Sequence, residues 1–194
     1  HPDLSLFNTI AIGPGLGLAK ETQQALKLLI QNTTVPLLFD ADALNILAEN
    51  KTWISFIPPL SIFTPHPKEF ERLFGKFANA FERNKRQIEF SVMHRIYIVL
   101  KGAFTSISTP DGKCFFNTTG NPGMATGGSG DVLTGVILGL LAQGYHPQEA
   151  AILGVYLHGL AGDIASKDKS QEAMIAGDIT ENLGAAFKKI RKNK

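Results

Sequence analysis

The chain has 194 residues and a formal net charge of +2, and 44% of its residues are hydrophobic while 19% are charged. This composition predicts one globular domain over residues 1–194, and the small charge gives no sign of nucleic-acid binding. No apolar stretch reaches the roughly 18 residues that a membrane span requires, and the single cysteine, Cys114, excludes an internal disulfide and suits a cytoplasmic protein.

Short apolar segments alternate with segments of helical periodicity along the chain. The expected strands are residues 9–13, 35–40, 60–64 and 95–102, followed by a hairpin over 104–117 that turns at "PDG". The expected helices are residues 19–32, 41–50, 67–75, 79–94, 131–143, 147–166 and 175–191. Alternating strands and helices predict an α/β fold, in which a mostly parallel sheet is covered by helices on both faces.

The polar and glycine-rich motifs each follow an expected strand or the hairpin. They are "GPGLG" (13–17), "DADALN" (40–45), "TPHPKEF" (64–70), "LKGAFT" (100–105) and "GNPGMATGGSGDVLTG" (120–135). Ligands of parallel sheets bind beyond the carboxyl ends of the strands. We therefore expect these motifs to share one rim of the sheet.

Several of these residues also have an ordinary structural interpretation. Asp42 could simply cap the helix after it, and His66 could cap or pack against the helix that starts at Pro67. Asp40 ends an apolar strand, where an unpaired carboxylate is costly unless it faces a polar crevice. Lys101 could reach a phosphate, or it could extend its ammonium group into solvent. The sequence leaves these alternatives open.

The run of glycines before Asp131 predicts an anion-binding site. Glycine N–H groups followed by a helix N-terminus offer free donors and partial positive charge, which suit a phosphate. Asp131 would then take a proton from a hydroxyl during phosphoryl transfer, or alternatively would only cap the helix. The P-loop pattern is absent, and the turn G-P-G-L-G-L does not match the dinucleotide fingerprint G-x-G-x-x-G.

These motifs, together with "HGLAGD" at 158–163, occur in the same order in a known family, and "GNPGMATGGSGD" is highly specific to it. The chain resembles the ADP- or ATP-dependent NAD(P)H-hydrate dehydratases of the ribokinase-like superfamily. The resemblance implies a three-layer ribokinase-like fold. The family's opening strand and helix have no counterpart in this sequence. In many bacteria the domain follows an NAD(P)HX epimerase domain, which is a possible partner on the full-length chain.

The resemblance implies repair of hydrated nicotinamide cofactors. NAD(P)HX would return to NADH or NADPH when its ring hydroxyl is phosphorylated by ADP or ATP with Mg²⁺ and the phosphate is then eliminated. The metal would be held largely by phosphate and water, so no protein ligand is named. A homo-oligomer is also expected. Two rivals remain, a kinase for a vitamin-like alcohol and an inactive nucleotide-binding fragment.

The resemblance also implies roles for individual residues, with Asp131 as the catalytic base. The substrate pocket would be formed by Gly15, Gly17, Asp40, Asp42, His66 and Glu69. The nucleotide would be bound by Lys101, Gly102, Ala103, Phe104, Thr105, Gly120, Asn121, Gly123, Met124, Thr126, Gly127, Gly128, Ser129 and Gly130.

Overall fold

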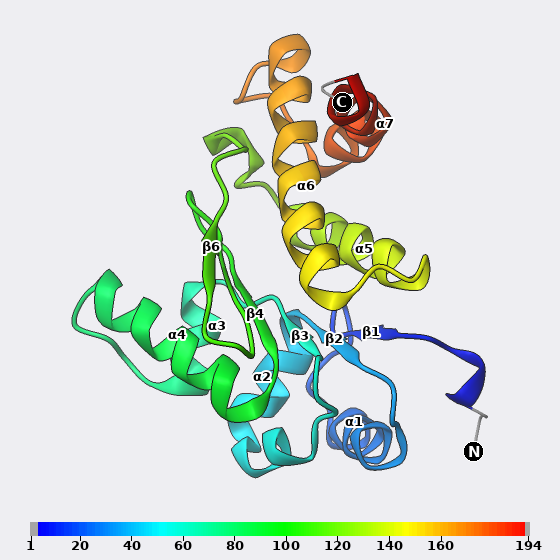
Figure 1. The fold of residues 1–194 in the computed structure, drawn as a ribbon, viewed down its shortest axis with the longest axis vertical. Coiled ribbons are helices and arrows are strands. Elements are labelled where there is room, and N and C mark those ends of the chain that lie inside the picture. The colour runs from blue at the N-terminus through cyan, green and yellow to red at the C-terminus, as the bar shows by residue number, and fades with distance from the viewer. Residues whose placement is uncertain (1–3, 193–194) are drawn as a thin grey trace.

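The computed structural model describes residues 4–192, in which one sheet contains six strands in chain order (Figure 1). The strands are β1 (Ile10–Ile12), β2 (Leu37–Phe39), β3 (Ile62–Phe63), β4 (Tyr97–Leu100), β5 (Ser106–Ser108) and β6 (Cys114–Phe116). Strands β1 to β4 pair in parallel, and β5 and β6 continue the sheet as the antiparallel hairpin expected around "PDG". The prediction of a mostly parallel sheet is confirmed.

The helices lie close to their expected limits. They are α1 (Lys20–Asn32), α2 (Ala41–Glu49), α3 (Pro67–Phe74), α4 (Ala80–His94), α5 (Ser129–Ala142), α6 (Pro147–Lys169) and α7 (Ala176–Lys192). Three short 3₁₀ helices, η1 (Leu4–Leu6), η2 (Lys51–Phe56) and η3 (Pro122–Met124), were not predicted. Such short turns leave no periodic pattern in a sequence. Within residues 4–192, no helix is both long and apolar enough to cross a membrane.

Two apolar cores lie on opposite faces of the sheet. Successive strand residues point to opposite faces. Leu38 of β2 therefore joins the core formed with α5, α6 and α7, whereas its neighbours Leu37 and Phe39 join the core formed with α1, α2 and α3. Figure 1 shows these two helical groups on either side of the sheet. The three-layer arrangement expected from the sequence is confirmed.

Backbone contacts align the carboxyl ends of the parallel strands. The Asp40 N–H donates to the Ile12 carbonyl at 3.1 Å, and the Thr64 N–H donates to the Phe39 carbonyl at 3.0 Å. Gly13 has a φ of 136°, and a Cβ at this position would overlap the Asp40 carbonyl oxygen. Only glycine allows the end of β1 to approach β2 this closely. The residues that follow these strands consequently lie on one rim.

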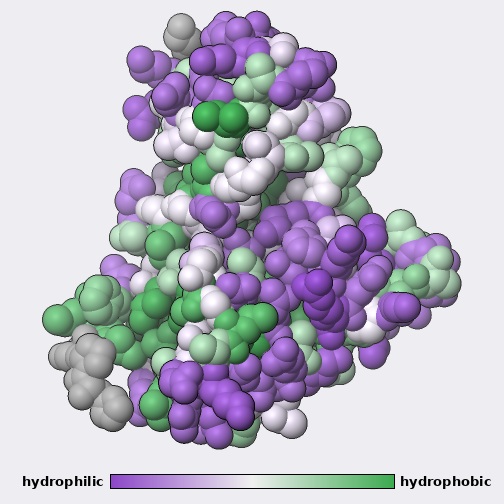
Figure 2. Space-filling model, turned by 180° about the vertical axis from the view of Figure 1, so that it is seen from behind, coloured by the Kyte–Doolittle hydropathy of each residue, from purple (hydrophilic) through white to green (hydrophobic). Residues whose placement is uncertain are grey.

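Strand β1 is less completely covered than the other parallel strands of the sheet. All three residues of β1 are half-buried, whereas those of β2, β3 and β4 are buried. A shallow groove of about 320 Å³ lies between α5 and α7, lined by Val132, Gly135, Val136, Thr180 and Leu183. Seen from behind, hydrophobic residues also gather beside the grey N-terminal atoms (Figure 2).

Candidate active site

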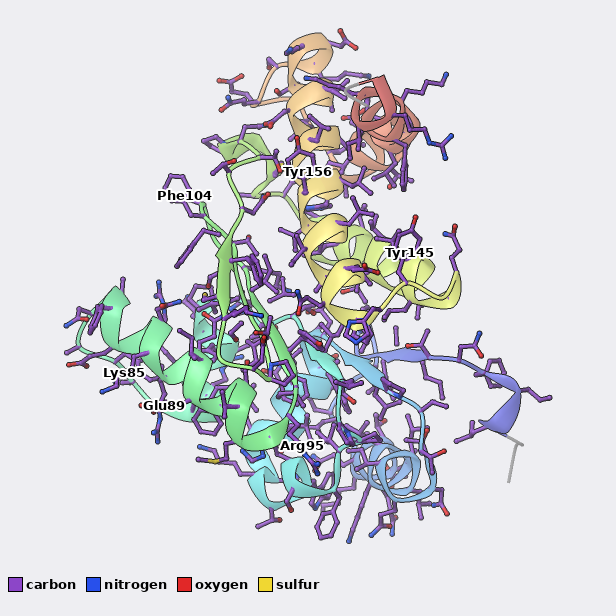
Figure 3. The ribbon with its side chains drawn as sticks, in the orientation of Figure 1. Lys85, Glu89, Arg95, Phe104, Tyr145 and Tyr156 are labelled. Atoms are coloured by element: carbon purple, nitrogen blue, oxygen red, sulfur yellow. The ribbon has the colours of Figure 1, made fainter. Side chains whose placement is uncertain are left out.

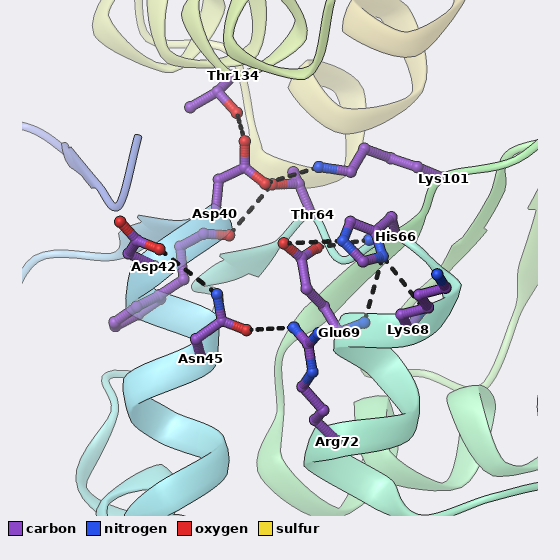
Figure 4. Close-up of polar contacts among 11 residues, drawn as sticks. Asp40, Asp42, Asn45, Thr64, His66, Lys68, Glu69, Arg72, Lys101 and Thr134 are labelled. Atoms are coloured by element: carbon purple, nitrogen blue, oxygen red, sulfur yellow. Dashed lines mark hydrogen bonds and ion pairs between the residues drawn. The ribbon is translucent and has the colours of Figure 1, made fainter. Parts of the chain in front are cut away.

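An ion pair between Asp40 and Lys101 lies at the centre of the rim (Figure 4). Asp40 follows β2 and its side chain is 1% exposed, while Lys101 follows β4 and its side chain is 21% exposed. Lys101 Nζ donates to Asp40 Oδ1 at 2.7 Å, and Thr134 Oγ1 donates to Asp40 Oδ2 at 2.8 Å. A buried carboxylate requires such partners. The contacts join the ends of β2 and β4 to the second turn of α5.

The ion pair lies directly beside the start of α5. A Cβ built on Gly130 would be 3.4 Å from Lys101 Nζ and 3.9 Å from Asp40 Oδ2. The interpretation of Lys101 as a solvent-directed side chain is therefore wrong. An ammonium group has three N–H donors and Asp40 uses one of them, so Lys101 can keep this ion pair and also contact an anion.

The first turn of α5 combines unpaired donors with an exposed acid. Gly128, in a left-handed conformation with φ 85°, is the N-cap residue, and Asp131 is the third helical residue. The interpretation of Asp131 as the cap is therefore wrong. Among residues 4–192, the backbone N–H groups of Gly130 and Asp131 have no acceptor, as is usual at a helix start. The Asp131 side chain is exposed and makes no ion pair or hydrogen bond with any described residue.

The segment before this turn uses its donors internally. The Gly120 N–H donates to Asp163 Oδ2 at 2.9 Å, and Asn121 Nδ2 donates to Asp163 Oδ1 at 3.0 Å. The Gly123 N–H donates to Asn121 Oδ1 at 3.1 Å. Gly120 and Gly123 thus do not offer free donors as a run of phosphate-binding glycines would. Their conformation supports the turn, whereas Gly130 and Asp131 keep open N–H groups.

His158 of α6 anchors the first residue of α5. Its side chain is buried, and Nε2 lies 2.9 Å from the Ser129 carbonyl oxygen, which can only accept, so Nε2 carries the proton. Burial lowers the pKa of His158 to about 4, the bond to Ser129 opposes this shift, and the charge of Lys101 adds to it. His158 is therefore neutral near pH 7.

Sequence reasoning assigned no role to His158, Asp163 or Thr134. The first two belong to "HGLAGD", whose resemblance to the family motif was the only signal available. Thr134 lies within an apolar helix pattern, and only the folded chain shows that its hydroxyl group reaches Asp40.

Asp42 connects two of the predicted substrate motifs. Its Oδ2 accepts a hydrogen bond from the Gly17 N–H at 2.9 Å, so it holds the "GPGLG" turn rather than capping α2. Gly15 and Gly17 both have positive φ, at 65° and 77°. Asn45 Nδ2 donates to Asp42 Oδ1 at 3.5 Å, and Arg72 Nη1 donates to Asn45 Oδ1 at 2.7 Å (Figure 4). This polar chain links the turn to α2 and α3.

His66 caps α3, as one of its two interpretations predicted. Its Nδ1 accepts from the N–H groups of Lys68 and Glu69 at 3.1 and 3.3 Å, while Glu69 Oε2 accepts from the His66 N–H at 2.7 Å. The other ring nitrogen, Nε2, lies 3.3 Å from Glu69 Oε1, and the His66 side chain is 43% exposed. The cap therefore fixes the ring and leaves one edge accessible at the rim. A substrate contact for His66 and Glu69 stays a prediction.

The loop after β4 is open to solvent. Gly102, Ala103 and Phe104 are exposed, and Phe104 lies with 72% exposure at the outer end of the β4–β5 connection (Figure 3). Thr105 Oγ1 donates to the Gly102 carbonyl at 3.1 Å and closes the loop. An exposed aromatic ring on a closed loop is suited to stacking on a planar base.

Replacing Lys101 with methionine tests the central ion pair. We expect Lys101→Met to lower the free energy of unfolding by about 3 kcal/mol, because it leaves a buried carboxylate without its charged partner. Urea denaturation followed by circular dichroism measures this change. Lys113→Met is the matched control, because Lys113 is 66% exposed and pairs with Asp111 at the surface. The control should lose less than about 1 kcal/mol, and equal losses would contradict the assignment.

The lowered pKa of His158 predicts a pH-dependent stability. Between pH 6.5, the ordinary pKa of a histidine, and about pH 4, the unfolded chain binds a proton at His158 and the folded chain does not. The free energy of unfolding should therefore fall as the pH is lowered through this window, by about 3 kcal/mol in all. His158→Gln retains a side-chain N–H but cannot titrate, so urea unfolding should show a shallower pH dependence. An unchanged slope would exclude this role of His158.

Comparison with known proteins identifies the family. A model of the NAD(P)H-hydrate dehydratase family matches residues 1–184. The bifunctional NAD(P)H-hydrate repair enzyme Nnr of Moorella thermoacetica is 44% identical over 182 residues, which cover 93% of this chain and 34% of that protein.

Two solved structures share the fold. The ADP/ATP-dependent NAD(P)H-hydrate dehydratase of Bacillus subtilis, co-crystallised with ATP and Mg²⁺, is 34% identical with a TM-score of 0.78, covering 94% of this chain and 64% of that one. A ribokinase-like superfamily protein of Enterococcus faecalis is 36% identical with a TM-score of 0.76, covering 94% and 63%. The chain thus spans less than two thirds of each relative. The chain belongs to the NAD(P)H-hydrate dehydratase family, and its sheet between two layers of helices is the ribokinase-like α/β fold.

Proposed function

We propose that the protein containing this chain dehydrates NAD(P)HX to NAD(P)H at the expense of ADP or ATP. The observation that carries the proposal is the exposed carboxylate of Asp131 beside the open N–H groups of Gly130 and Asp131. The ammonium group of Lys101 lies next to the same turn. This arrangement can bind a phosphate and can also accept a proton from a hydroxyl. The family of the chain and the ATP complex of its Bacillus relative support this assignment.

The first chemical step is a phosphoryl transfer. Asp131 removes the proton of the ring hydroxyl while the hydroxyl oxygen attacks the terminal phosphorus of ADP or ATP. The bond from that phosphorus to the bridging oxygen breaks, and AMP or ADP leaves with the electron pair. The N–H groups at the start of α5 stabilise the charge that develops on the transferred group.

The second step eliminates phosphate from the ring. The C–O bond of the phosphate ester breaks with the assistance of the lone pair on the adjacent ring nitrogen, and inorganic phosphate leaves. Loss of a proton from the neighbouring ring carbon forms the double bond of the reduced nicotinamide. Phosphate is a much better leaving group than hydroxide, which explains why a dehydratase would use a kinase-like site.

The rim divides into two binding regions in this proposal. Asp42, His66 and Glu69, with the turn that contains Gly15 and Gly17, would form the substrate wall. The exposed loop that contains Phe104 and the turn before α5 would hold the nucleotide. Gly120, Asn121, Gly123 and Met124 would support that turn, and Asp40 would orient Lys101.

The residues present fit a magnesium ion that arrives with the nucleotide. Residues 4–192 contain no group of three or more His, Cys, Asp or Glu side chains that could hold a metal ion. In this proposal, phosphate oxygens and water supply most ligands of the ion, as is usual for Mg²⁺ at sites that bind nucleotide phosphates. When bound, the ion neutralises phosphate charge.

We infer that the full-length protein carries an additional NAD(P)HX epimerase domain, because the Moorella relative is a bifunctional repair enzyme of which this chain covers 34%. We also infer a homo-oligomer, and analytical ultracentrifugation of the full-length protein would measure its state.

The activity is tested with the full-length protein that contains this chain. Absorbance of reduced nicotinamide should recover from NADHX or NADPHX only when ADP or ATP and Mg²⁺ are present. Recovery without nucleotide would contradict the proposal. A stable phosphorylated alcohol as the final product would instead indicate a small-molecule kinase, and nucleotide binding without turnover would indicate an inactive binding module.

Asp131→Asn tests the catalytic base directly. Asparagine keeps the shape of the side chain but cannot accept the hydroxyl proton, so turnover should fall at least ~10²-fold. Stability should change by about 0.5 kcal/mol, because only the interaction of a first-turn acid with the helix dipole is lost. Nucleotide affinity, measured by calorimetry, should stay equal or rise because a negative charge near phosphate is removed. Asp168→Asn, at an exposed acid near the end of α6, is the control, and near-normal turnover in Asp131→Asn would rule out the base.

A further inference from the structure

Helix α6 holds the segment that leads to the proposed phosphate site at both of its ends. We call residues 119–129 the crossing segment, which runs along α6 between β6 and α5 (Figure 1). At its beginning, Asp163 accepts hydrogen bonds from the Gly120 N–H at 2.9 Å and from Asn121 Nδ2 at 3.0 Å. At its end, His158 Nε2 donates to the Ser129 carbonyl at 2.9 Å. We call residues 126–131 the glycine turn; it begins between these two attachments and ends, just past Ser129, at the open N–H groups of Gly130 and Asp131.

The surface of α6 allows this close approach because two of its residues have no side chain. A Cβ at Gly159 would overlap Thr119, and a Cβ at Gly162 would overlap the Met124 side chain. Thr119 Oγ1 also donates to the Tyr156 carbonyl at 3.0 Å. The position of the crossing segment is therefore set by its contact with α6.

Short hydrogen-bonded turns connect Asp163 to the glycine turn. Asn121 donates to Asp163 with its amide nitrogen and accepts from the Gly123 N–H with its amide oxygen at 3.1 Å, which caps η3. Beyond η3, the Thr126 carbonyl accepts from the Ser129 N–H at 3.3 Å. Only a few residues of short, bonded turns separate Asp163 from the donors at the start of α5.

We propose that Asp163 is a positioning residue that sets the geometry of the glycine turn and thereby its affinity for nucleotide phosphate. The inference rests on the proposed function, since it takes this turn as the phosphate site. Asp163 touches neither the turn nor a reacting atom. It acts through Asn121 and Gly120, whose donors require an acceptor at this point of α6.

Exchanging the two side chains provides the sharpest test. In Asp163→Asn, the new amide nitrogen faces that of Asn121, and in Asn121→Asp, two carboxylates face each other. The double variant Asp163→Asn/Asn121→Asp can restore all three hydrogen bonds, because residue 163 still accepts from Gly120, its amide donates to residue 121, and residue 121 still accepts from Gly123. Each single variant should raise the Kd for ADP roughly tenfold, and the double variant should return it to within about twofold of the parent.

Two measurements separate positioning from a merely structural role. Calorimetric titration with ADP should show the weaker binding at a temperature where the variants are folded. Amide hydrogen exchange in the absence of nucleotide should become faster at Ser129 and Val132 in both single variants, and should recover in the double variant. These two N–H groups are hydrogen-bonded, to the Thr126 carbonyl at 3.3 Å and the Gly128 carbonyl at 3.0 Å, so they can report a loosened turn. Asp168→Asn, an exposed acid on the same helix, should change neither readout.

The outcomes also separate this inference from the proposed function. Faster exchange confined to Gly120–Gly123, or an unchanged Kd in both single variants, would overturn the positioning role of Asp163 even in an active dehydratase. If the parent lacks dehydratase activity or ADP binding, the exchange pattern alone still decides the role of Asp163, because it needs neither substrate nor nucleotide.

Discussion

The buried ion pair of Asp40 and Lys101 is the interaction on which the rest of the site depends. It lies where β2 and β4 end. Thr134 of α5 donates a hydrogen bond to the second carboxylate oxygen of Asp40. Removing the two charges from water is costly, and their attraction offsets this cost only in a fixed geometry with every oxygen satisfied. That requirement ties the register of two strands to the position of a helix. The ends of the strands and the start of α5 are therefore held as one unit.

The glycine-rich segment divides into two parts with different physical roles. Its first half gives its N–H groups to Asp163 and Asn121, so it is a support whose shape depends on α6. Its second half ends in a helix start whose N–H groups have no acceptor among residues 4–192. Free donors at a helix start suit an anion because unpaired N–H groups and the helix dipole act together. The proposed phosphate site is thus short, and most of the glycine-rich segment serves to position it.

Polar groups at the rim combine structural hydrogen bonds with partly exposed side chains. His66 uses Nδ1 and its backbone N–H to cap α3, which fixes the ring while the side chain stays 43% exposed. Asp42 likewise accepts a hydrogen bond from the Gly17 N–H while remaining half-buried. Preorganised side chains of this kind lose little conformational entropy when a ligand binds. Capping and binding are therefore compatible for these residues.

The sequence by itself determined the α/β class, the limits of nearly every helix and strand, and the common rim, because periodicity and the position of polar residues after strands are local properties. The glycine run before Asp131 already suggested a phosphate site with a catalytic base, and the family resemblance added the substrate and the individual binding residues. Only the tertiary structure decided that Gly128 caps α5, that Lys101 pairs with Asp40, and that His158 and Asp163 hold the crossing segment. These contacts join residues far apart in the chain, and their partners are chosen by how helices pack on the sheet, which no local pattern encodes.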